Sequence, residues 1–136
     1  MKQSKQKFPT ILRQGDVLLV AVLGALHRPT AVSRDNGRVV LAYGEVTGHS
    51  HAIADEGAVL TVLDHRTEMA DAVRRLLADV GLPHEIRDED VVGVLEVPAG
   101  GKLVHEEHGT ILLTSERYAV LRQREYSPEA IRQVAD

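Results

Sequence analysis

The chain of 136 residues contains no cysteine and no tryptophan, and only one phenylalanine and three tyrosines. Without cysteine neither a disulfide nor a thiolate metal site can form, so any transition-metal site must use histidine and carboxylate side chains. Because aromatic residues are so few, the core must be built mainly from valine, leucine, isoleucine and alanine, which favours β-sheets. No apolar run approaches the roughly 18 residues of a membrane helix, so we expect no membrane segment.

Basic residues are fewer than acidic ones, 16 against 20. The formal net charge is −4, which argues against nucleic-acid binding because neutralising phosphates needs a clustered basic surface. The length is that of one ordinary domain, so we expect a single β-rich domain over residues 1–136, with residues 1–8 as a loose N-terminal tail. No apolar stretch of a secretory signal follows the lysines of this tail, and we therefore expect a cytoplasmic protein.

Most of the chain has patterns typical of β-strands. Residues 17–23 form a continuous apolar run, which predicts a core strand buried on both faces. Residues 30–32 and 38–43 flank Asn36-Gly37, a dipeptide that favours tight turns, so we expect them to pair as a hairpin. Further strands are expected at residues 52–54, 58–63, 91–97, 103–105, 110–113 and 117–124. The prediction is a mainly β protein, a small antiparallel barrel or sandwich of which the jelly roll is one form.

One segment departs from the β patterns. Apolar residues recur at helical spacing over residues 68–80, which predicts an inserted amphipathic helix. Thr67 is the expected N-cap, and Gly81 ends the helix. A short C-terminal helix is expected to start at Ser127, which is followed by a proline suited to the first helical position.

Two short stretches carry four of the seven histidines. His49 and His51 lie one residue apart after a glycine, and His105 and His108 enclose two glutamates. In an extended segment, residues i and i+2 project from the same face, so the first pair can point at one centre. Neutral imidazoles bind transition metals. We predict that the two stretches meet and that all four histidines are metal ligands; the competing interpretation is a hydrogen-bonded polar cluster or a proton-transfer pair.

Neighbouring carboxylates are candidates for additional ligands or for hydrogen-bond partners of ligand imidazoles. These carboxylates are Glu45, Glu56, Glu106 and Glu107. The expected ion is divalent zinc, iron, manganese or nickel. Three protein ligands and an open position would make a metalloenzyme of unknown substrate, whereas four histidines that close the coordination sphere would make a structural site.

The last predicted strand carries a second candidate surface. Strand alternation places Arg122, Arg124 and Tyr126 on one face, where they can contact a small-molecule or anionic ligand, or a second subunit in a homo-oligomer. The alternative without a binding function is an edge strand whose charged side chains prevent it from pairing with another chain. The rival functional hypothesis is therefore a non-enzymatic binding or assembly module that uses the histidines and this strand as a recognition surface.

Four blocks of sequence together resemble a family of small, uncharacterised bacterial and prophage proteins. They are QGDVLL at residues 14–19, GEVTGHSH at 44–51, LVHEEH at 103–108 and RQREY at 122–126. This resemblance covers most of the chain and implies no known activity.

A second resemblance is to the cupin superfamily, whose jelly-roll barrels hold a metal ion. Its first motif is similar to the positions of Gly44, His49, His51 and Glu56, and its second to those of Gly93, Pro98, Gly100 and His105. The resemblance implies a jelly roll in which His49, His51, Glu56 and His105 are the ligands, with His108 as a substitute or neighbour.

Overall fold

The computed structural model describes residues 10–44, 48–82 and 85–123. The predicted tail and C-terminal helix lie outside these residues. Within them the chain forms ten strands, one α-helix and one short 3-10 helix: β1 (Ile11–Gln14), β2 (Val17–Ala21), β3 (Thr30–Ala31), β4 (Val39–Tyr43), β5 (Ser50–Ile53), β6 (Val59–Val62), α1 (Arg66–Asp79), η1 (Asp88–Asp90), β7 (Val91–Glu96), β8 (Gly101–Leu103), β9 (Ile111–Leu113) and β10 (Arg117–Arg122).

Six strands form one antiparallel sheet, called here the large sheet, in the order β1-β2-β10-β7-β6-β3. Its central strands are apolar on both faces. In β2, Leu18 and Val20 belong to one core cluster, whereas Val17 and Leu19 belong to the other. The prediction of a core strand buried on both faces is confirmed, and it explains why this stretch is continuously apolar rather than alternating.

Helix α1 covers one face of the large sheet. Its stripe of Met69, Val73, Leu76 and Leu77 is buried against residues of β2, β7 and β10. The predicted amphipathic helix is confirmed, but its start was placed too late: the N-cap is His65, which makes no side-chain capping bond, and not Thr67. Among the described residues, no helix has the length and apolarity needed to cross a membrane.

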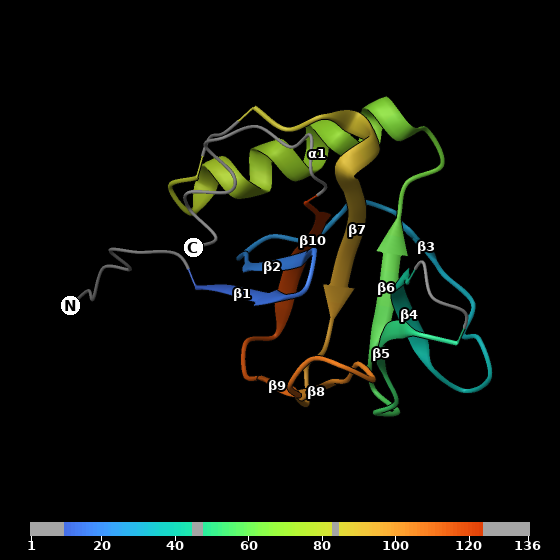
Figure 1. Cartoon of the computed structure of the whole chain (residues 1–136). Coiled ribbons are helices and arrows are strands. Elements are labelled where there is room, and N and C mark those ends of the chain that lie inside the picture. The colour runs from blue at the N-terminus through green and yellow to red at the C-terminus, as the bar shows by residue number, and fades with distance from the viewer. Residues whose placement is uncertain (1–9, 45–47, 83–84, 124–136) are drawn as a thin grey trace.

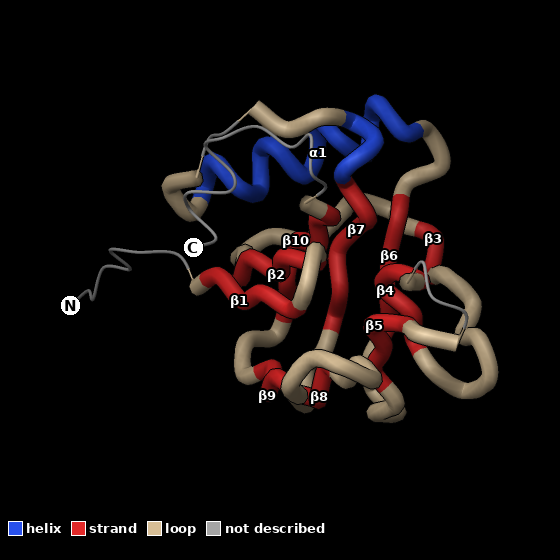
Figure 2. The backbone as a smooth tube through the Cα atoms, viewed as in Figure 1, coloured by secondary structure: helices blue, strands red, loops and turns tan. Residues whose placement is uncertain are grey.

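The opposite face of the large sheet is covered by two small antiparallel pairs, β4-β5 and β8-β9. Figures 1 and 2 show β8 and β9 at the end of the molecule away from α1. The two pairs are joined by one β-bridge, in which Ala52 and Val104 exchange backbone hydrogen bonds of 3.0 and 2.9 Å. The arrangement is sandwich-like, and the described strands form no closed barrel, so the sandwich form of the prediction is the correct one.

The predicted hairpin of residues 30–43 is only partly correct. The tight turn exists: Asp35 and Arg38 exchange backbone hydrogen bonds of 2.8 and 3.1 Å, and Gly37 has φ +81°. However, β3 pairs with β6 in the large sheet, whereas β4 pairs with β5. The strands diverge because β4 buries its apolar side chains in the core of the sandwich, while the short, exposed β3 extends the edge of the large sheet.

Candidate metal centre

The bridge between β5 and the end of β8 brings the two histidine stretches together. Ala52 pairs with Val104 in antiparallel fashion, which sets the preceding His51 beside the following His105. One step further along, the backbone N–H of Ser50 donates to Oε1 of Glu106 at 3.0 Å. This hydrogen bond lowers the pKa of Glu106 below its usual value. Backbone pairing therefore determines which parts of the two stretches face each other.

All four predicted histidines lie in one cluster, called here the histidine cluster (His49, His51, His105 and His108). The ring of His105 is central: its centroid lies 5.7 Å from that of His49, 4.3 Å from that of His51 and 4.6 Å from that of His108. His51 is almost completely buried, and the other three are more accessible. The structure thus brings together the residues expected to share a site.

Gln14, at the end of β1, fixes the orientation of His51. Its amide nitrogen donates to the backbone carbonyls of Leu103 and Gly109, at 3.0 and 2.9 Å, so its Oε1 is the atom that faces the imidazole. Nδ1 of His51 lies 2.9 Å from this oxygen and must donate to it. Gln14 is itself buried, and it ties His51 to both sides of the 105–108 segment.

Asp16 lies on the other side of His51. Its Oδ1 is 3.5 Å from Nε2 of His51, and its Oδ2 accepts a hydrogen bond of 2.8 Å from Nε of Arg122. The contact with His51 and the guanidinium of Arg122 together hold the pKa of Asp16 well below its usual range, although partial burial acts against them. Asp16 is therefore ionised at neutral pH.

His105 has a different hydrogen-bond pattern from His51. Its Nδ1 accepts the backbone N–H groups of Glu107 and His108, at 3.0 and 3.4 Å, so the proton of its neutral ring lies on Nε2. Burial, and then the neighbouring imidazoles of His51 and His108, lower the pKa of His105, while Glu106 acts in the opposite direction. The central ring of the cluster is thus biased toward its neutral form.

Three of the four predicted carboxylates lie among the described residues, and their positions differ. Glu106 offers an oxygen that, with ring nitrogens of His49 and His105, completes a set of three ligand atoms within 4.8 Å of one another, called here the outer triad. Glu107 lies 3.7 Å from Nδ1 of His49. Glu56 is exposed in the turn between β5 and β6, where its carbonyl accepts from Arg34, and it is not part of this set.

The predicted recognition strand is described only in part. Arg122 donates to Asp16 and also to the carbonyl of Tyr43, at 3.0 Å. Its anionic contact in the structure is thus a carboxylate of the same chain. Arg124, Tyr126 and the candidate ligand Glu45 lie outside the described residues.

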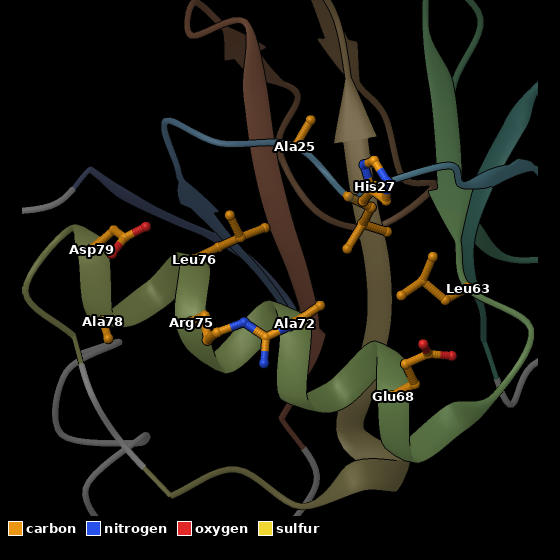
Figure 3. A pocket seen from close by; sticks show the side chains of 10 residues that line it. Ala25, His27, Leu63, Glu68, Ala72, Arg75, Leu76, Ala78 and Asp79 are labelled. Atoms are coloured by element: carbon orange, nitrogen blue, oxygen red, sulfur yellow. The ribbon is translucent and has the colours of Figure 1, made fainter.

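Two surface hollows lie elsewhere, beside α1. One, of about 600 Å³, is lined by apolar residues together with His27, Glu68, Arg75 and Asp79. Figure 3 shows side chains of α1 on one side of it and those of His27 and Leu63 on the other. The second, of about 740 Å³, lies near the end of the same helix. Neither hollow is lined by a residue of the histidine cluster, so both hollows are separate from the candidate metal site.

Sequence reasoning missed Gln14 and Asp16 as parts of the site. Both belong to a Gln-Gly-Asp stretch whose composition predicts a turn, and the structure has a turn there, between β1 and β2. The one available signal was a polar glutamine and a carboxylate directly beside a buried strand. That position is unusual for a solvated turn, because such residues are rarely buried without a partner.

Comparison with known families assigns most of the chain. Residues 13–123 match the family described as Domain of unknown function (DUF8820). The match covers far more than half of the chain, so the protein belongs to this family. It agrees with the expectation of an uncharacterised family. No curated protein and no solved structure gives a significant match.

Proposed function

We propose that the protein binds a divalent transition-metal ion in the histidine cluster. The observation that supports this most strongly is the convergence of four imidazoles from two distant segments, with His105 at the centre. A donor set of imidazole nitrogens and carboxylate oxygens, without thiolates, suits zinc, iron, manganese or nickel. The low pKa of His105 favours the neutral form that an ion requires.

The chemistry available to such an ion depends on how many protein atoms hold it. Two imidazoles and one carboxylate, as in the outer triad, would leave positions for water or substrate. An ion held in this way would lower the pKa of a bound water and would supply a nucleophile or a Lewis acid. The proposal is therefore a metal-binding protein with an open coordination sphere, which is the arrangement of a metalloenzyme.

The test uses the full chain, purified without an affinity tag and freed of metal. Zinc, ferrous iron, manganese and nickel are titrated separately by calorimetry, and the loaded protein is analysed for its metal content. We expect one ion per chain and loss of binding in His105→Ala, because this ring contacts the other three. The matched control is His65→Ala, which removes an exposed imidazole at the start of α1 and should bind as the wild type does.

Two results would contradict the proposal. One is the absence of stoichiometric metal together with unchanged stability in the presence of each ion. The other is wild-type affinity in His105→Ala. The pH dependence gives a further check, since ligand imidazoles must be neutral: affinity should fall as the pH drops below about 6.5. An affinity that stays constant from about pH 8 to pH 5 is incompatible with histidine ligands.

The rival proposal, recognition of an external anion through Arg122, has less support. The guanidinium of Arg122 is already engaged by Asp16 and by the carbonyl of Tyr43. An incoming anion could use only the N–H groups that these two contacts leave, and it would approach a guanidinium whose charge Asp16 already offsets.

A further inference from the structure

The orientation of His51 is that of a metal-ligating histidine. Such residues typically donate one ring N–H to a carbonyl or carboxylate, which leaves the other nitrogen with a lone pair directed at the ion. His51 donates from Nδ1 to Oε1 of Gln14, and Gln14 cannot rotate its amide without losing two hydrogen bonds to backbone carbonyls. In neutral His51 the free lone pair is therefore on Nε2.

This Nε2 faces a carboxylate. Oδ1 of Asp16 lies 3.5 Å away, and the other oxygen of this carboxylate accepts from Arg122, so two electron-rich atoms face each other unless a cation lies between them. A proton shared between an imidazolium and a carboxylate usually draws the two atoms to about 2.7–2.9 Å. Two ligand atoms about 2.1 Å from one tetrahedral ion are separated by about 3.4 Å. The observed distance fits a shared metal ion better than a shared proton.

We infer that Asp16 is a ligand of the metal ion, which lies between its Oδ1 and Nε2 of His51. The inference rests on the proposed metal binding and assigns a ligand pair to it. Asp16 is suited to this role because Arg122 holds its other oxygen, and ligating carboxylates are commonly fixed by such hydrogen bonds. Among the described residues, Asp16 and His51 belong to no set of three ligand atoms within 4.8 Å of one another, so water or substrate would fill the remaining positions.

Gly15 keeps this location accessible to the imidazoles. A Cβ atom at Gly15 would lie 2.8 Å from Nε2 of His108 and 3.2 Å from Cε1 of His51. Any other residue would therefore push these rings away from the turn that carries Asp16. The glycine also has φ +60°, a conformation that side chains disfavour. The β1–β2 turn is thus shaped so that the two imidazoles can approach the carboxylate.

The outer triad is the competing location, and its hydrogen bonds suit it less well. Nδ1 of His105 accepts two backbone N–H groups, so binding an ion through Nε2 would require the proton to move to Nδ1 and those contacts to break. His51 needs no such change. The pair formed by His51 and Asp16 is also the less exposed of the two locations, with His51 almost completely buried.

Zinc titration of the full-length protein tests the inference through three variants. Asp16→Asn keeps the size of the side chain but removes the anionic ligand. We expect it to weaken zinc binding by more than about 100-fold, beyond the roughly 10- to 100-fold typical of residues outside the coordination sphere. Glu106→Gln should change the affinity by less than about 10-fold. Arg122→Gln removes the ion pair with Asp16 but leaves the Asp16 carboxylate in place, and should weaken zinc binding by no more than roughly 10- to 100-fold.

Nitrogen NMR of the wild-type protein provides a second measurement that does not depend on whether a variant folds. On addition of zinc, Nε2 of His51 should show the shift of a metal-bound nitrogen while Nδ1 stays protonated. The inference is overturned if Asp16→Asn binds zinc like the wild type, if Arg122→Gln loses as much affinity as Asp16→Asn, or if Nε2 of His51 keeps a proton in saturating zinc.

The failures of the two proposals can be told apart. If His105→Ala abolishes zinc binding but Asp16→Asn does not, the protein binds metal and the ion lies in the outer triad instead. If the wild-type protein binds no metal, both proposals fail, and the cation between Asp16 and His51 is a proton only.

Discussion

The two faces of the large sheet are built in different ways. On the face covered by α1, aliphatic side chains such as Val73 and Leu77 fill the space between sheet and helix. On the other face the aliphatic packing gives way, near the end of β1, to a polar network in which Gln14, His51 and Asp16 contact one another in sequence. The first face depends on volume and apolarity. The second depends on hydrogen-bond directions, because each buried polar atom needs its partner in place.

The largest effect on stability should come from the helix-covered face. Leu77 is fully buried, and Leu77→Ala should lower the free energy of unfolding by about 2–5 kcal/mol, through lost burial and the cavity left behind. Urea denaturation measures this change. Leu23, which is 78% exposed, provides the control: Leu23→Ala should stay within about 0.5 kcal/mol. Zinc affinity of the folded Leu77→Ala protein should equal that of the wild type, and a clear loss would mean that the two faces are not independent.

On the polar face, a substitution that changes the side-chain volume only a little should still lower stability, because it removes hydrogen bonds. Gln14→Leu leaves the carbonyls of Leu103 and Gly109 and Nδ1 of His51 without their partner, which should cost about 1–3 kcal/mol. Unlike Leu77→Ala, it should also weaken zinc binding by roughly 10- to 100-fold, because His51 loses its orientation. Urea denaturation and zinc titration are the two measurements.

The matched control for this change is Gln123→Leu. Gln123 is also buried, but its side-chain amide has no hydrogen-bond partner among the described residues. Replacing it with leucine should therefore leave stability unchanged or raise it, since a buried polar group without a partner is unfavourable. Equal destabilisation by the two glutamine changes would show that volume, and not hydrogen bonding, governs this face as well.

The contrast between the faces also explains what can be predicted from the sequence. The helix repeats its apolar positions every three to four residues, and β2 is continuously apolar, so both elements are encoded locally. The starting residue of α1 was harder to place, because His65 caps the helix without any side-chain hydrogen bond. Local patterns therefore predict the helix, the central strand and the sandwich-like β class, but less reliably their ends.

The polar network depends on contacts between residues far apart in the chain. The types of residue in the two histidine stretches are enough to suggest that they meet, but the bridge between Ala52 and Val104 that aligns them leaves no local pattern. Gln14 and Asp16 look like ordinary turn residues until the fold places His51 between them. Pairing with other strands also separates β3 from β4: β3 pairs with β6 and β4 with β5, although the turn between β3 and β4 was correctly predicted.

Two glycines with positive φ give a finer comparison. Gly15 and Gly37 have φ +60° and +81°, so an alanine at either position should cost about 1–2 kcal/mol in backbone strain. A Cβ at Gly37 would meet no atom within 4 Å, whereas one at Gly15 would meet the flexible end of His108 at 2.8 Å. Because His108 can turn away, we expect similar losses of stability in urea but weaker zinc binding in Gly15→Ala alone. Unchanged zinc affinity in Gly15→Ala would separate this turn from the site.

The smallest effects on stability are expected from removing one ion pair on each face of the large sheet. Asp16 pairs with Arg122 beside the histidine cluster, and Asp88 pairs with Arg74 of α1 at 2.7 Å. In the folded protein the pKa values of both carboxyls lie below their usual range, Asp16 through His51 and Arg122, and Asp88 chiefly through Arg74. Each therefore stabilises the folded state above the unfolded pKa of about 3.9, and this contribution is lost as the pH falls toward the lower folded value.

Urea denaturation of metal-free Asp16→Asn and Asp88→Asn, from neutral to acid pH, tests this last contrast. Each variant should be less stable than the wild type near pH 7, and the difference should shrink as the pH falls below about 4, because protonation removes the same charge from the wild type. Asp16 and Asp88 are similarly exposed, 37% and 35%, but Asp16 also lies beside the almost completely buried ring of His51. Added salt should therefore reduce the effect of Asp88→Asn more strongly. If salt abolishes the effect of Asp16→Asn equally, the carboxylate beside His51 is an ordinary solvated charge, and the polar face is less sheltered than its hydrogen bonds imply.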